Sequence, residues 1–121
     1  MTMTQTGKRT ADDIRLRGSY DKEAAQYDAL RYKSVEGRFF SNLELSVLRS
    51  WIPLGRGKKV LDMPAGTGRL SIALSESGAT VVGTDISLNM LAEADAKATK
   101  DGAAHAHFVH GSGVQLPFPD N

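Results

Sequence analysis

The stretch that decides the fold is Val60–Leu70, VLDMPAGTGRL. Apolar residues lead into Asp62, a loop of small residues follows, and a helical pattern begins near Arg69. Gly66 and Gly68 allow the main chain to approach a ligand closely, because no Cβ stands in the way. The stretch therefore predicts a strand, a ligand-binding loop and a helix. A lone Gly-x-Gly pattern does not separate the possible ligands, so the neighbouring residues have to do so.

Length and composition limit the class of protein. The 121 residues have room for one modest domain, and the apolar share of 40% and charged share of 24% are ordinary for a soluble globular chain. No apolar run approaches the roughly 18 residues of a membrane span, and the first ten residues lack the apolar segment of a signal peptide. Since the chain also has no cysteine, we expect a cytoplasmic protein. The net charge of +1 argues against a dedicated nucleic-acid binder.

The charges are unevenly distributed along the chain. Residues 1–60 carry 12 Lys or Arg against 7 Asp or Glu, a balance of +5, whereas residues 61–121 carry 3 against 7, a balance of −4. A basic first half could attract an anionic substrate or a membrane surface. We favour the simpler interpretation, a solvated helical face whose charges partly pair with the acidic half.

The first half reads as a mobile leader, residues 1–10, followed by N-terminal helices over residues 11–57. A helical pattern runs from Ala11 to about Tyr32, and Gly18-Ser19 is expected to split it. A second helix is indicated by apolar residues at three- and four-residue spacing, and we expect its apolar face to lie in the core. These residues are Phe39, Phe40, Leu43, Val47, Leu48 and Trp51.

The second half alternates between strand and helix patterns, which predicts a parallel sheet with right-handed crossovers. Ser87 is a plausible N-cap just after Asp85. The expected strands are Lys59–Met63, Thr80–Thr84 and Ala106–Val109, and the expected helices are Arg69–Glu76 and Ser87–Lys100.

Ligands of parallel sheets bind beyond the carboxyl ends of the strands, where the loops converge. Three such loops are expected here, Asp62–Gly68, Asp85–Ser87 and His110–Val114. The helix that follows the first loop presents free N–H groups, which favour an anionic group such as a carboxylate. Asp85 lies 17 residues beyond Gly68, where an acid can accept both hydroxyls of a ribose. Together these features indicate a ligand that contains adenosine.

Asp62 favours one adenosine ligand over the others. A dinucleotide-binding fingerprint needs a third glycine, and Ser71 stands at that site; a phosphate-binding P-loop pattern is absent. A carboxylate at the start of the loop repels a pyrophosphate, but it suits a ligand that carries an ammonium and a sulfonium. S-adenosylmethionine has this chemistry, with its carboxylate at the helix N-terminus and its ribose on Asp85.

Four segments resemble motifs of the class I S-adenosylmethionine-dependent methyltransferases, in the small-molecule branch that includes the ubiquinone/menaquinone methyltransferases. In chain order they are SYDKEAAQYDALRY (19–32), VLDMPAGTGRL (60–70), GTDISLNML (83–91) and GSGVQLPFPDN (111–121). The resemblance implies a Rossmann-like α/β core, with residues 58–121 as the cofactor-binding half. It also implies S-adenosyl-L-methionine as the cofactor and a small molecule as the methyl acceptor.

The resemblance also implies roles for individual residues. Those at the methionine end of the cofactor are Asp62, Ala65, Gly66 and Gly68. Those at the adenosine end are Asp85 on the ribose, Ile86 against adenine, and Gly111, Ser112, Gly113 and Val114 at the adenine edge. Those that close over the methyl group or meet the carboxylate are Tyr20, Tyr27 and Arg31.

Two positions depart from the family pattern. Pro64 replaces a usual glycine and has no N–H to donate. Ser112 replaces a usual aspartate, so the adenine amino group meets a neutral hydroxyl.

Structural alternatives stand beside these assignments. The two glycines could only form a tight turn, and Asp85 could only support the helix start. Tyr20 and Tyr27 lie seven residues apart on one helical face, so packing explains them equally well.

A metal site at the three histidines is the weaker interpretation. His105 and His107 share a strand face, His110 points the other way, and no acid cluster joins them. We therefore expect ordinary strand histidines and no metal.

The expected chemistry is in-line attack of a nucleophilic atom on the sulfonium methyl, for which no residue is nominated as general base. Only three of the family's strands precede Asn121, so the core is expected to be truncated. The strand Lys59–Met63 would then have an unpaired edge, which favours self-association. We expect little methyl transfer by this chain alone. The alternatives are an NAD(P)-dependent oxidoreductase and a non-catalytic cofactor-binding domain.

Overall fold

The computed structural model describes residues 11–120, and the predicted mobile leader, residues 1–10, lies outside the described residues. Each strand and helix expected after residue 58 is confirmed, with ends that differ by one residue or less. The elements are α1 (Ala11–Glu23), the 3-10 helix η1 (Ala24–Gln26), α2 (Tyr27–Arg31), α3 (Val35–Trp51), β1 (Lys59–Asp62), α4 (Arg69–Ser75), β2 (Thr80–Asp85), α5 (Leu88–Asp101) and β3 (Ala106–His110).

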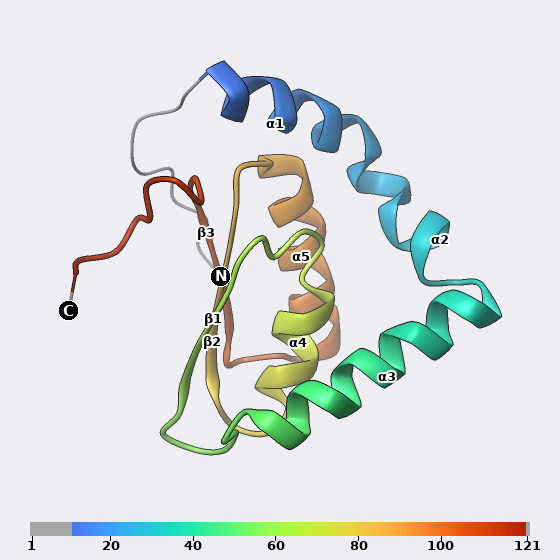
Figure 1. Cartoon of the computed structure of the whole chain (residues 1–121), viewed down its shortest axis with the longest axis vertical. Coiled ribbons are helices and arrows are strands. Elements are labelled where there is room, and N and C mark those ends of the chain that lie inside the picture. Colours follow the sequence, from blue (N-terminus) through green and yellow to red (C-terminus); the bar gives the residue numbers. More distant parts are fainter. Residues whose placement is uncertain (1–10, 121) are drawn as a thin grey trace.

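The three strands form a parallel sheet in the order β1-β2-β3, as the alternating pattern predicted. Asp62 pairs with Gly83, and Asp85 pairs with His110, so the three carboxyl ends lie at one edge of the sheet. Helices α4 and α5 cover one face (Figure 1). Between them and the sheet, Phe108 and the small side chains of α5 form the centre of the core.

The break in the first helical segment lies later than predicted. Helix α1 continues through Gly18-Ser19 to Glu23, and the change of direction occurs at η1, Ala24–Gln26. Both Gly18 and Ser19 are exposed, and a glycine within an exposed helix costs only about 1 kcal/mol. Helix α1 then lies at the end of the sheet where the strands finish (Figure 1), above the loops expected to bind the ligand.

The apolar face of α3 is not part of the core, contrary to the prediction. Phe39 is 62% exposed and Trp51 is 78% exposed. The physical reason is that polar contacts hold α3 to α4: Arg69 donates to Ser41 and Glu44, and Arg49 pairs with Glu76. The remaining residues of that face that are exposed are Phe40, Leu43 and Val47; Leu48 is half-buried.

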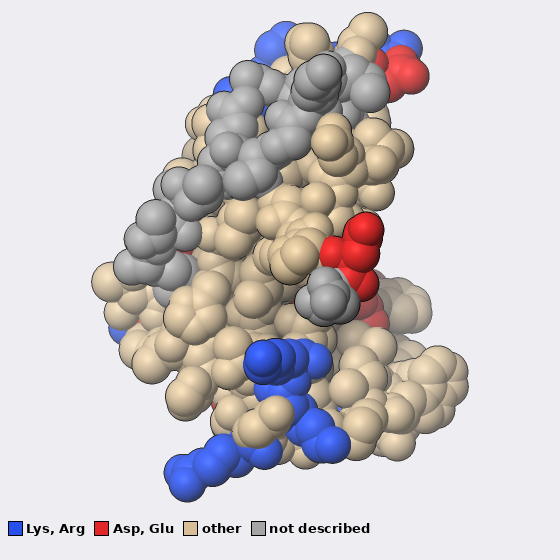
Figure 2. All heavy atoms as spheres, turned by 90° about the vertical axis from the view of Figure 1, so that its left-hand side faces the viewer, with Lys and Arg blue, Asp and Glu red and all other residues tan. Residues whose placement is uncertain are grey.

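The second face of the sheet carries no helix among the described residues. Leu61 of β1 is 46% exposed there, and Val82 and Val109 are only half-buried. Figure 2 views this side of the molecule and shows a largely uncharged surface with Lys and Arg side chains gathered at one end. In residues 11–120, no helix combines the length and apolar character that crossing a bilayer requires.

Candidate functional site

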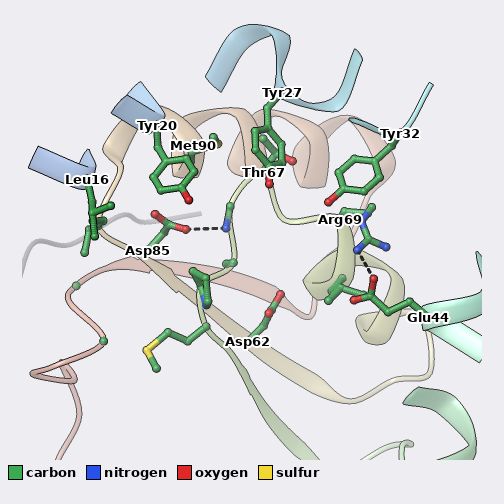
Figure 3. A pocket seen from close by; sticks show the side chains of 18 of the residues that line it. Leu16, Tyr20, Tyr27, Tyr32, Glu44, Asp62, Thr67, Arg69, Asp85 and Met90 are labelled. Carbon is green, nitrogen blue, oxygen red and sulfur yellow. Dashed lines mark hydrogen bonds and ion pairs between the residues drawn. The ribbon is translucent and has the colours of Figure 1, made fainter. Parts of the chain in front are cut away.

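A pocket of about 590 Å³ opens where the three strands end, within the size range of small-molecule sites. The strand ends and their loops form one side, and α1, α2 and the following turn form the other (Figure 3). Ten of the residues predicted to bind cofactor line this pocket. They are Tyr20, Tyr27, Asp62, Ala65, Gly66, Asp85, Ile86, Gly111, Gly113 and Val114.

Asp85 lies at the carboxyl end of β2 and is 7% exposed. Its Oδ2 accepts the N–H of Gly66 at 2.8 Å, and its Oδ1 accepts the N–H of Ser87 at 3.0 Å. Burial raises the pKa of Asp85 above its ordinary value, although the backbone N–H groups of Ser87 and Gly66 oppose this shift. Each carboxylate oxygen has a second lone pair, so the side chain retains the capacity to accept hydroxyl groups from a ligand.

Asp62 ends β1 and faces the same pocket from the neighbouring strand (Figure 3). Its Oδ2 accepts the hydroxyl of Ser71 at 2.7 Å. Burial raises the pKa of Asp62; the hydrogen bonds from Ser71 and the charge of Arg69 lower it, and the negative charge of Asp85 adds to the rise. Two partly desolvated carboxylates therefore share one cavity, an arrangement that favours a cationic ligand.

The loop between β1 and α4 is fixed from below by the sheet. Ala65 donates its N–H to the carbonyl of Thr84 at 2.8 Å, and the Met63–Pro64 peptide bond is cis. A Cβ at Gly83 would lie 2.8 Å from the Cβ of Ala65 and 2.7 Å from the ring of Phe108. Gly83, for which the sequence predicted no role, therefore allows the loop to lie directly on β2.

Three of the predicted residues lie outside the pocket lining. Gly68 is the N-cap of α4 in a left-handed conformation, with φ +79°, and faces the core. Ser112 is buried, accepts the N–H of Val114 at 3.3 Å and pairs with Gln115. The Arg31 guanidinium lies 4.8 Å from the centre of the Tyr27 ring.

Aromatic side chains from the N-terminal helices close the opposite side of the pocket. Tyr20, Tyr27 and Tyr32 project from α1, α2 and the turn after α2 toward the loop (Figure 3). The Arg69 guanidinium lies 4.5 Å from the centre of the Tyr32 ring and donates to Glu44 at 3.1 Å. Tyr32, Glu44 and Arg69 were not predicted as site residues, and only the position of Arg69 directly after Gly68 could have indicated its place.

The histidines do not gather into a metal site. His107 is exposed on β3, whereas His110 is buried with its Nε2 2.7 Å from the carbonyl oxygen of Ile86. Within residues 11–120, no group of three or more His, Cys, Asp or Glu side chains is placed to hold a metal ion.

Comparison with known proteins identifies the family. The methyltransferase domain family matches residues 60–121, which is half of the chain. The demethylmenaquinone methyltransferase of Geobacillus stearothermophilus is 32% identical over 116 residues, which cover 93% of this chain and 49% of that protein. The chain therefore spans about half the length of the curated relatives it matches.

Solved structures support the same fold. Magnesium protoporphyrin IX methyltransferase of Synechocystis PCC 6803, with bound S-adenosylmethionine, matches 92% of this chain and 59% of its own, with a TM-score of 0.68 and 25% identity. The [4+2]-cyclase SpnF matches 99% of this chain and 48% of its own, with a TM-score of 0.78 and 17% identity, which shows the fold alone. The chain belongs to the class I methyltransferases, whose cofactor is S-adenosylmethionine.

Proposed function

We propose that the pocket binds S-adenosyl-L-methionine for methyl transfer to a small-molecule acceptor. The observation that carries the proposal is the pair of carboxylates, Asp62 and Asp85, that face one cavity from the ends of adjacent strands. Asp62 suits the ammonium and sulfonium of the methionine end, and Asp85 suits the ribose hydroxyls. The family match and the relatives named as methyltransferases support this function over an NAD(P)-dependent oxidoreductase or a non-catalytic domain.

The remaining contacts follow from the position of each residue. Ala65 and Gly66 lie beside the methionine end, with Gly68 shaping the turn behind them. Ile86 would pack on adenine, and Gly111–Val114, which includes the buried Ser112, would flank the adenine edge. Tyr20 and Tyr27 would cover the methyl group. Arg31 would have to leave the ring of Tyr27 to meet the carboxylate.

These residues bind and orient the cofactor, which supplies the electrophilic methyl group when it is bound. The side chains from α1 and α2 limit the access of water from one side, and the strand loops fix the ligand from the other. No described residue is assigned as a general base.

For the methyl acceptor we propose only its class, a small molecule. The relatives named demethylmenaquinone methyltransferases support a small-molecule acceptor. The location in the cytoplasm stays a prediction from the sequence.

We also propose that the chain associates with itself through the open edge of β1. In residues 11–120, β1 pairs only with β2, and exposed strand edges pair readily with other chains.

Titration of the purified chain with S-adenosylhomocysteine and, separately, with NADH tests the cofactor proposal. Isothermal titration calorimetry should detect saturable binding of S-adenosylhomocysteine at one site and none of NADH. Binding of NADH, or of neither compound, contradicts the proposal.

A further inference from the structure

Asp28 joins the N-terminal helices to the loop that shapes the pocket. This carboxylate lies on α2, Tyr27–Arg31. Its Oδ1 accepts the hydroxyl of Thr67 at 2.5 Å, and its Oδ2 accepts the ammonium of Lys97, on α5, at 2.5 Å. The Lys97 ammonium also lies 3.3 Å from the Thr67 hydroxyl. Three elements that are distant in the sequence therefore meet at one carboxylate.

Thr67 makes this contact relevant to the ligand. It stands between Gly66 and Gly68 and is almost fully buried, so it cannot move unless the loop moves with it. Tyr27 immediately precedes Asp28 and lines the same pocket as Thr67 (Figure 3). One carboxylate thus contacts the loop that lines the pocket and belongs to the helix that carries the pocket's Tyr27 ring.

Apolar burial does little to hold this part of the chain. Within η1 and α2 only Ala24 is buried, so polar contacts must supply most of the attachment. A second such contact lies one segment earlier, where Asp21 accepts the hydroxyl of Ser87 and the N–H of Asn89. The segment Ala24–Arg31, which we name the cap, is therefore held by the polar contacts of Asp28 within it and of Asp21, which lies just before it on α1.

We propose that Asp28 is a positioning residue that couples closure of the cap to occupation of the loop by the cofactor. Any ligand that orders the loop also orders Thr67, which strengthens the hydrogen bond between Thr67 and Asp28 and so keeps the cap closed. In turn, a closed cap keeps the loop in the conformation that binds. This inference rests on the proposed cofactor site, because it names the cofactor as the ligand that occupies the loop.

The first test measures the affinity for S-adenosylhomocysteine by calorimetry. Asp28→Ala and Lys97→Met should each weaken binding roughly 10-fold, in the range of measured coupling between sites. Lys97→Arg keeps a cationic donor and should bind close to wild type. Asp12→Ala is the matched control, because Asp12 is also a helical carboxylate near an arginine but is fully outside the pocket.

The thermal stability of Asp28→Ala shows whether a loss of affinity comes from misplaced binding residues or from unfolding of the protein. The side chains of Asp28 and Lys97 are 33% and 32% exposed, so their ion pair is a small part of the unfolding free energy, and the hydrogen bond to the buried Thr67 hydroxyl adds a modest part. Asp28→Ala should therefore melt below wild type but remain folded at the temperature of the binding assay, as circular dichroism can check, while binding more weakly. Unchanged affinity in Asp28→Ala overturns the proposal.

Hydrogen–deuterium exchange provides the second test and does not depend on the ligand. In Asp28→Ala without ligand, exchange should rise both in the cap and in the loop Ala65–Gly68. If wild type does not bind S-adenosylhomocysteine, the cofactor proposal fails, but this exchange measurement still decides the coupling. A rise confined to the cap, with the loop unchanged, overturns it.

Discussion

The two glycines of the loop should respond very differently to the same added methyl group. Gly68→Ala places a Cβ 2.8 Å from the Cβ of Ala94 and 2.8 Å from the ring of Phe108, both fully buried. The residue also has φ +79°, which costs an L side chain about 1–2 kcal/mol. Overpacking a filled core costs about 1–3 kcal/mol more. The expected loss of unfolding free energy is therefore about 2–5 kcal/mol.

Gly66→Ala is the matched variant two residues earlier. Gly66 also has a positive φ, +56°, but a Cβ there meets no heavy atom within 4 Å. Only the backbone cost of about 1–2 kcal/mol applies. Urea unfolding followed by circular dichroism measures both variants against wild type. Equal losses, or a larger loss for Gly66→Ala, would refute the conclusion that Gly68 serves core packing and Gly66 serves the pocket side.

Three further predictions concern a charge, a helix cap and the sheet edge. Burial raises the pKa of Asp62, so the folded state holds this proton more tightly than the unfolded state, and stability is lost as pH rises through the raised pKa. Asp62→Asn should therefore increase the free energy of unfolding at about pH 7 but not at about pH 3, measured by urea titration, and a loss at about pH 7 would contradict this. Ser87→Ala removes the N-cap of α5, whose hydroxyl accepts the N–H of Met90 at 3.1 Å and also donates to Asp21. It should cost about 1–2 kcal/mol, measured by thermal melting, and an unchanged melt would show that these two contacts of Ser87 contribute little. Leu61→Lys places a charge on the open face of β1, where it would also repel a second copy of the strand paired edge to edge. Sedimentation velocity should then show less self-association, with stability changed by less than about 0.5 kcal/mol; undiminished association would place the contact away from β1.

Local patterns predicted the part of the fold that holds the site. The strands and helices after residue 58 follow from alternating apolar and helical runs, and Asp62 and Asp85 follow from their places at strand ends. Parallel pairing then brings the two carboxylates to one edge without any further information. The same logic placed Ser87 at the start of α5, where its side chain caps the helix.

Other features depend on contacts that sequence patterns do not encode. The apolar spacing of α3 predicted an amphipathic helix correctly, but spacing does not say what covers the face, and in the described chain Phe39 and Trp51 remain exposed. The contacts of Asp28 with Thr67 and Lys97 join residues 39 and 69 positions apart, and each residue alone reads as an ordinary surface side chain. The different surroundings of Gly66 and Gly68 likewise depend on Phe108, which belongs to another strand and packs only against Gly68 of the two.

The affinity of wild type and Asp85→Ala for S-adenosylhomocysteine tests the central claim most directly. Under our proposal Asp85 is the acceptor for the ribose hydroxyls, so its loss should weaken binding by roughly 30-fold or more. The control Asp101→Ala removes an exposed carboxylate at the end of α5 and should bind like wild type. Asp85→Ala must first be shown by circular dichroism to be folded, because Asp85 also accepts two backbone N–H groups. Saturable binding by wild type that is lost in folded Asp85→Ala and kept in Asp101→Ala is the predicted result. Equal affinity in wild type and folded Asp85→Ala would contradict the assignment of this pocket as the cofactor site.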